Sequence, residues 1–148
     1  MSTLFDAQTR AAMHARIDRL EATRAGMWGK MDAPQMVCHA ADQLRVALGD
    51  IRTRERRNFL RFKPLRTLLV YWLPWPKGKV PTVREMQTSQ PAAWEGDLAL
   101  LHGLVDRFAD RRPDEPWAPH PAFGLIGGRE WGRLCHKHLD HHLRQFAV

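Results

Sequence analysis

Residues 131–146 read WGRLCHKHLDHHLRQF, and this stretch does most to decide the fold and the candidate site. It contains no proline and no internal turn signal, so it predicts a single helix. At about 100° per residue, one arc of that helix is mainly apolar and the opposite arc is charged. The apolar arc comprises Trp131, Leu134, Cys135, His138, His142, Gln145 and Phe146, and the charged arc comprises Arg133, Lys137, Asp140 and Arg144.

Two of the four histidines in this helix lie on its apolar arc, one turn apart. With i, i+4 spacing, His138 and His142 can offer two imidazoles from one helix to one transition metal. The alternative is a pair of structural core histidines, which is less favoured because apolar neighbours cannot satisfy two adjacent imidazoles. His136 is expected to be exposed and dispensable, while His141 lies at the edge of the arc. Cys135 is interpreted as a buried, inert thiol rather than as a fourth ligand.

Three further segments have helical periodicity, which predicts an all-α domain over residues 1–148. The first is expected over residues 3–25. The second should begin after Asp32, with Gln35 completing a capping box, and end near Gly49. The third should begin near residue 91, capped by Ser89, and end at residues 111–113. Residues 113–128 are rich in proline and glycine and predict a loop across one end of the helices. His39 lies on the inner arc of the second helix and becomes a candidate third ligand.

Residues 51–88 interrupt this pattern with a basic run followed by the apolar stretch 68–76. Long connections in small domains are usually functional or disordered, and the apolar content argues against disorder. Three placements are open: packing on the helices near the histidines, contact with a second subunit, or binding to an anionic membrane surface. We favour the first two together, so a homodimer is expected, with Trp72 and Trp75 anchored against the helices or the second subunit.

Composition bounds the possible classes of protein. A length of 148 residues suits one domain with a real core. The net charge of +7 permits an anionic partner without requiring one. The two cysteines do not suggest a secreted disulfide scaffold. We see no signal-peptide pattern and no apolar run of the ~18 residues that a membrane span needs, so a cytoplasmic protein is expected.

The histidine pattern resembles the DinB/YfiT-like superfamily of metal-binding four-helix bundles. Residues 138–145, HLDHHLRQ, are similar to its C-terminal ligand motif, in which the first and last histidines of an H-x-x-H-H cluster bind the metal. The resemblance therefore implies His138 and His142 as ligands, and His39 matches the first ligand position. HPAFG at 120–124, EWG at 130–132 and WPKGK at 75–79 are similar to a branch of unknown function. Apart from WPKGK, the resemblance implies nothing about the insert at 51–88.

What the resemblance implies is a four-helix bundle with a divalent metal at one end and open coordination positions. Characterised relatives include thiol-dependent transferases and isomerases. Three imidazoles suit Zn, Ni or Fe better than Mg or Ca, and three protein ligands with open positions are typical of a catalytic metal. The leading hypothesis is therefore a metal-dependent hydrolase or thiol transferase that acts on a small molecule. Asp42 and Gln145 are close enough in sequence to orient an imidazole or a substrate, and no general base stands out.

Two alternatives belong to other classes of protein. A nucleic-acid-binding module would explain the basic run, but the chain has no helix-turn-helix, zinc-finger or aromatic-platform motif, so nucleic acid is disfavoured as a partner. In the other alternative, the metal only stabilises an interaction module. Metal content and salt-dependent DNA binding would separate these hypotheses.

Overall fold

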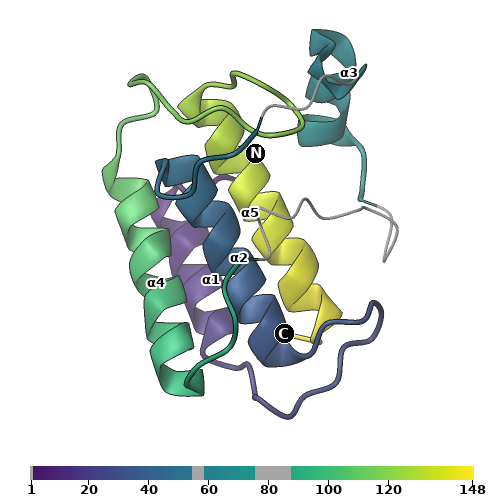
Figure 1. Cartoon of the computed structure of the whole chain (residues 1–148), viewed down its shortest axis with the longest axis vertical. Helices are drawn as coiled ribbons and strands as arrows, with labels where there is room; N and C mark the ends of the chain where they lie inside the picture. Colours follow the sequence, from purple (N-terminus) through teal and green to yellow (C-terminus); the bar gives the residue numbers. More distant parts are fainter. Residues whose placement is uncertain (1, 55–58, 76–87) are drawn as a thin grey trace.

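A computed structural model describes residues 2–54, 59–75 and 88–148 of the chain. Over these residues the protein is all-helical, with five α-helices and no strand (Figure 1). The four longer helices lie side by side: α1 (Ala7–Ile17), α2 (Ala33–Leu48), α4 (Trp94–Asp110) and α5 (Gly128–Gln145). Helices α1 and α2 each pack against both α4 and α5. The predicted all-α class is thus confirmed, while the single domain over residues 1–148 stays a prediction.

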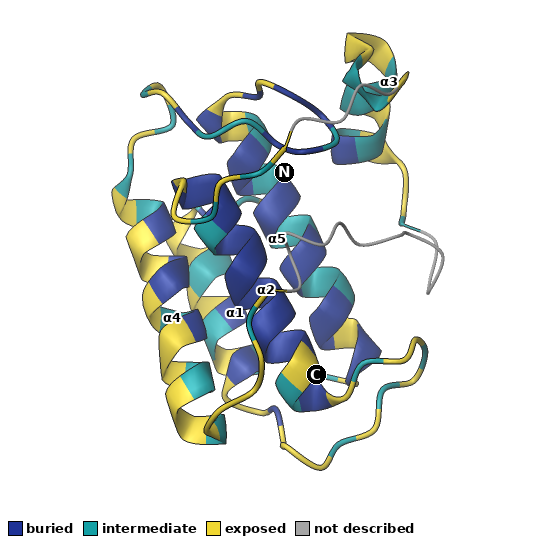
Figure 2. Cartoon of the chain, in the orientation of Figure 1, coloured by how far each residue is buried: buried dark blue, intermediate teal, exposed yellow. Residues whose placement is uncertain are grey.

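Helix α2 is the most buried helix of the fold, as its scarcity of charged residues predicts (Figure 2). The Asp32 carboxylate accepts from the Gln35 backbone N–H at 2.8 Å, and the Gln35 side chain accepts from the Asp32 N–H at 3.0 Å. This is the predicted capping box. The helix ends at Gly49, whose φ of 87° is the left-handed conformation that favours glycine at a helix end. Both predicted ends of α2 are confirmed.

Helix α1 is shorter than the predicted segment 3–25. It begins after Asp6, whose carboxylate accepts from the Thr9 N–H at 2.7 Å. It ends at Ile17, where a turn closed by the Leu20 N–H on the Ile17 carbonyl, at 3.0 Å, returns the chain to the core. The Leu20 side chain is buried there. Burial of this side chain therefore ends the helix although the helical periodicity continues. The predicted helix was too long at both ends.

Helix α4 also begins later than predicted, at Trp94 instead of near residue 91. Ser89 does not cap it, because its N–H and hydroxyl donate to Asp42 on α2. The end at Asp110 agrees with the prediction. The following loop crosses one end of the helices, as expected (Figure 1), and buries Trp117 and Phe123.

The predicted rotational phase of α5 is confirmed. Every residue assigned to the apolar arc is buried: Trp131, Leu134, Cys135, His138, His142, Gln145 and Phe146. His136, however, is half-buried, so its predicted exposure was wrong. The reason is that residues 71–74 lie beside it on the charged face of α5. Burial lowers the pKa of His136 below its usual value.

The insert is held against α5 by basic side chains. It contains η1 (Phe59–Arg61), α3 (Lys63–Thr67) and η2 (Leu68–Trp72). Lys137 Nζ donates to the carbonyls of Leu69 at 2.6 Å and Leu73 at 2.5 Å. Leu69 belongs to η2 and Leu73 directly follows it, so one ammonium group binds the backbone on both sides of the end of η2. The charged arc of α5 therefore binds a segment of the chain as well as facing water.

The two tryptophans of the insert differ in their surroundings. Trp75 is partly buried and packs on the core, as predicted. Trp72 is 68% exposed, so it is not anchored against the helices, and its predicted contact with a second subunit stays a prediction. Val70 is fully buried and holds η2 to the fold instead. Within the described residues, no helix has the length and apolar character to cross a membrane.

Candidate metal centre

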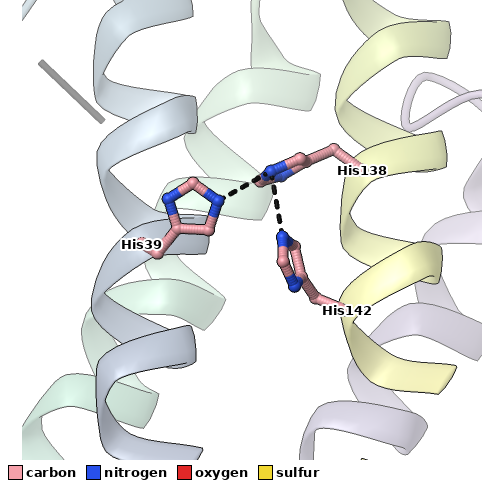
Figure 3. A group of neighbouring side chains, drawn as sticks. All are labelled: His39, His138 and His142. Carbon is pink, nitrogen blue, oxygen red and sulfur yellow. Dashed lines mark hydrogen bonds between the residues drawn. The ribbon is translucent and has the colours of Figure 1, made fainter. Parts of the chain in front are cut away.

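Three buried histidines from two helices meet between α2 and α5 (Figure 3). His39 Nε2 lies 2.9 Å from His138 Nε2, and His138 Nε2 lies 3.2 Å from His142 Nε2. The three candidate ligand atoms all lie within 4.8 Å of one another. The structure thus brings together the three residues that the sequence singled out, and such a group could hold a metal ion.

Two of the three nitrogen separations are close to those around one tetrahedral ion. Zinc binds histidine nitrogen at about 2.0–2.1 Å, which places two tetrahedral ligands about 3.3 Å apart. The measured 2.9 and 3.2 Å separations are close to this value. A neutral imidazole ring has only one N–H, so three ring nitrogens that face one point have too few protons to hydrogen-bond all of one another. A shared cation at that point satisfies all three.

Gln145 fixes the tautomer of His142. Its amide Nε2 donates to the Trp28 carbonyl at 2.5 Å, so Gln145 Oε1 is the atom that lies 2.8 Å from His142 Nδ1. An amide oxygen can only accept, so His142 Nδ1 carries the proton and its Nε2 presents a lone pair to the centre. The predicted orienting role of Gln145 is therefore seen in the contacts. Gly29, with φ of +82°, permits this approach, since a Cβ there would lie 2.6 Å from Gln145 Nε2.

Burial keeps two of these rings neutral. It lowers the pKa of His142 to about 3, with the neighbouring His39 as a smaller cause. It also lowers the pKa of His138 well below its usual value, helped by the adjacent imidazoles. Neutral imidazole is the form that binds metals. His138 Nδ1 has no hydrogen-bond partner within the described residues, so packing against neighbouring rings, including Trp75 with centroids 5.8 Å apart, holds its orientation.

A cavity of about 390 Å³ gives access to the centre from the side of His39. Its described lining also includes Lys30, Met31, Gln35, Ser89, Gln90 and Pro91. This volume is in the range of small-molecule sites. The lining combines a cationic side chain, hydroxyl and amide groups, so a small polar molecule could bind next to His39.

Asp42 does not orient any of the three histidines in the described contacts, contrary to the suggestion from its sequence position. It is fully buried, and its carboxylate accepts hydrogen bonds from the backbone N–H and hydroxyl groups of Thr88 and Ser89. Asp42 therefore ties the segment before α4 to α2, one turn after His39. Sequence reasoning missed this role, for which a charged residue on a buried arc was the available signal.

The cysteines have the character of inert thiols. Both Cys38 and Cys135 are buried and unpaired. Burial raises the pKa of Cys38 to about 11 and raises that of Cys135 further. Neither belongs to the three-histidine group found among the described residues. These observations agree with the interpretation of Cys135 as a packing residue.

His120 has a structural role at the end of the helices. Its Nδ1 accepts from the N–H groups of Ala122 and Phe123, both at 3.1 Å, which closes the turn at residues 120–124. Its ring also stacks on Phe123, with centroids 4.6 Å apart. Burial lowers its pKa from the ordinary 6.5 to about 3. The folded state thus requires neutral His120.

We expect acid to destabilise the protein through His120. The pKa of His120 is lower in the folded state than in the unfolded state. Its contribution to stability is therefore fully present above pH 6.5 and is lost progressively as the pH drops toward 3. The loss is about 1.4 kcal/mol per pH unit within that window. A His120→Asn variant keeps an acceptor but does not titrate. Urea unfolding between about pH 6 and pH 4 measures the free energy of unfolding. In His120→Asn this free energy should fall less steeply with pH than in wild type, by the equivalent of about one proton. Equal slopes would contradict this assignment.

The comparisons with known proteins concern mainly the C-terminal part of the chain. Residues 78–148, a little under half of the chain, match the model of a family described as a protein of unknown function (DUF1569). No curated protein and no solved structure matches the chain. The matched range includes α4 and α5, with His138 and His142, but not His39. No comparison ties the chain to the DinB/YfiT-like superfamily, so that resemblance stays a prediction. Over α4 and α5, the chain is therefore similar to a family whose function is unknown.

Proposed function

We propose that this protein binds one divalent transition metal through His39, His138 and His142, within a DinB/YfiT-like four-helix bundle. The observation that carries the proposal is the convergence of three buried Nε2 atoms at separations of 2.9 and 3.2 Å. Neutral imidazoles favour Zn²⁺, Ni²⁺ or Fe²⁺ over hard cations. The fixed tautomer of His142 is the preorganisation that a ligand histidine needs.

The reaction class that fits this centre is hydrolysis or thiol transfer on a small molecule. With three protein ligands, a bound metal keeps an open position and can lower the pKa of a water or thiol held there. The chain contributes the orientation of the imidazoles and a polar cavity beside His39. Lys30 and Gln90 line this cavity, and their ammonium and amide groups can donate hydrogen bonds to a polar substrate.

Elemental analysis tests the metal-binding proposal directly. Protein purified without chelator and passed through gel filtration should retain about one tightly bound equivalent of Zn, Ni or Fe. His136→Ala is the matched control, because it removes a histidine of the same helix outside the three-histidine group. Wild-type protein that neither contains nor takes up a transition metal would contradict the proposal.

Homodimer formation through the insert is the second part of the proposal. Phe59 in η1, Phe62 between η1 and α3, and Trp72 in η2 are 75%, 67% and 68% exposed, which leaves three aromatic side chains on the surface of the insert. Exposed aromatic groups of this kind are common anchors of protein contacts. Sedimentation velocity should show a dimer that Phe62→Ser weakens toward monomer. A wild-type monomer at all concentrations would exclude this contact.

A further inference from the structure

A second pair of histidines lies between α1 and α4, and it shares no residue with the three-histidine centre. His14 on α1 and His102 on α4 stack with ring centroids 4.9 Å apart. Their Nδ1 atoms are 2.6 Å apart. The other nitrogen of each ring faces a carboxylate: His14 Nε2 lies 2.9 Å from Asp106, and His102 Nε2 lies 3.0 Å from Asp18.

The carboxylates determine where the ring protons lie. An ionised carboxylate can only accept, so Nε2 of both His14 and His102 must carry a proton. In a neutral ring the remaining Nδ1 then presents a lone pair. The two lone pairs face each other across 2.6 Å, an arrangement that is repulsive unless a proton or a metal cation lies between them. The pair can therefore share either a proton or a metal ion.

The surroundings match those of metal-bound histidines. A metal-ligating histidine usually donates its second N–H to a carboxylate or carbonyl, which orients the ring. Both His14 and His102 do so. Their side chains are 22% and 27% exposed, so an ion can enter and water can complete its coordination. The only other charged group within ion-pair distance among the described residues is Arg10, 3.9 Å from Asp106, which helps to hold that carboxylate in place.

From this geometry we propose that His14 and His102 form a second, surface-accessible site for a divalent transition metal such as Zn²⁺. Asp106 and Asp18 are its orienting residues. Uptake requires the two Nδ1 atoms to move apart from 2.6 Å to about 3.3 Å, the separation of two ligands on one tetrahedral zinc ion. Small rotations of two partly exposed rings provide this movement. The site does not depend on metal binding at His39, His138 and His142.

Calorimetric titration with Zn²⁺ alone, on chelator-treated full-length protein at pH 7.5, tests the second site. His102→Ala should bind one equivalent fewer than wild type, whatever the three-histidine centre binds. Asp106→Ala should keep the stoichiometry but weaken the affinity of this one site about ten- to hundredfold. Far-ultraviolet circular dichroism confirms folding of each variant, which is expected because these side chains are partly exposed.

His136→Ala is the matched control for general surface binding and should behave as wild type. Two outcomes overturn the second site. One is equal Zn²⁺ stoichiometry in wild type and His102→Ala, which would mean that the pair shares only a proton. The other is unchanged affinity in Asp106→Ala. Failure of the three-histidine centre appears separately, because His102→Ala would then bind no Zn²⁺ while wild type would still bind one equivalent at the second site.

Discussion

A His142→Ala variant is expected to lose the tightly bound metal and, with it, the effect of chelator on the unfolding temperature. A metal that binds only the folded state stabilises it by about 2.7 kcal/mol at a free concentration of one hundred times the dissociation constant. For a chain of this size, that corresponds to about 5–10 °C in melting temperature. Thermal unfolding followed by circular dichroism, with and without chelator, measures the difference. Wild type should show this gap, and His142→Ala should show almost none.

Two further variants of α5 make the experiment quantitative. His136→Ala should keep the full difference in melting temperature with and without chelator, because this residue is outside the three-histidine group. Gln145→Ala should reduce this difference in melting temperature, because it removes the acceptor that fixes the His142 tautomer. Loss of such a partner usually weakens metal binding ten- to hundredfold. Equal melting temperatures with and without chelator in wild type would contradict a folded-state metal site.

The elements that sequence predicts best here are those defined by local signals. The capping box of Asp32 and Gln35 and the left-handed Gly49 mark both ends of α2 within a few residues of sequence. The phase of α5 follows from periodicity, which places His138 and His142 on its buried face. The ends of α1 and α4 depend instead on distant burial and hydrogen bonds. Leu20 and Ser89 turn toward the core, and no local pattern reveals those contacts.

The candidate site likewise has one part that local sequence signals predict and another that depends on contacts between helices. Spacing alone predicts the pairing of His138 and His142, because both belong to one helix. Their meeting with His39 requires the packing of α2 on α5. His39 was a candidate third ligand from its place on the inner arc of its helix, and the resemblance to a known superfamily supported that expectation. The pair His14 and His102, separated by 88 positions, was not predicted at all. Neither helix alone indicates which residues of the other it will face.

Asp42 holds the segment before α4 to α2, a role that sequence reasoning missed, and its removal is expected to be strongly destabilising. The side chain is fully buried and accepts four hydrogen bonds of 2.5 to 3.0 Å from the N–H and hydroxyl groups of Thr88 and Ser89. Asp42→Ala leaves two backbone N–H groups without their acceptor and releases the segment before α4. The expected loss is about 3–5 kcal/mol in the free energy of unfolding, measured with urea.

Asp97→Ala is the matched control for this variant. Asp97 also accepts a backbone N–H of the same connecting segment, that of Ala92 at 3.0 Å, but this contact is exposed, so its loss should cost about 1 kcal/mol or less. Asp42→Asn should fall between the two, because the amide keeps one acceptor oxygen. Ser89 also lines the cavity beside His39, so Asp42→Ala should weaken metal binding as well. An Asp42→Ala variant no less stable than Asp97→Ala would show that the carboxylate is not what holds this segment to α2.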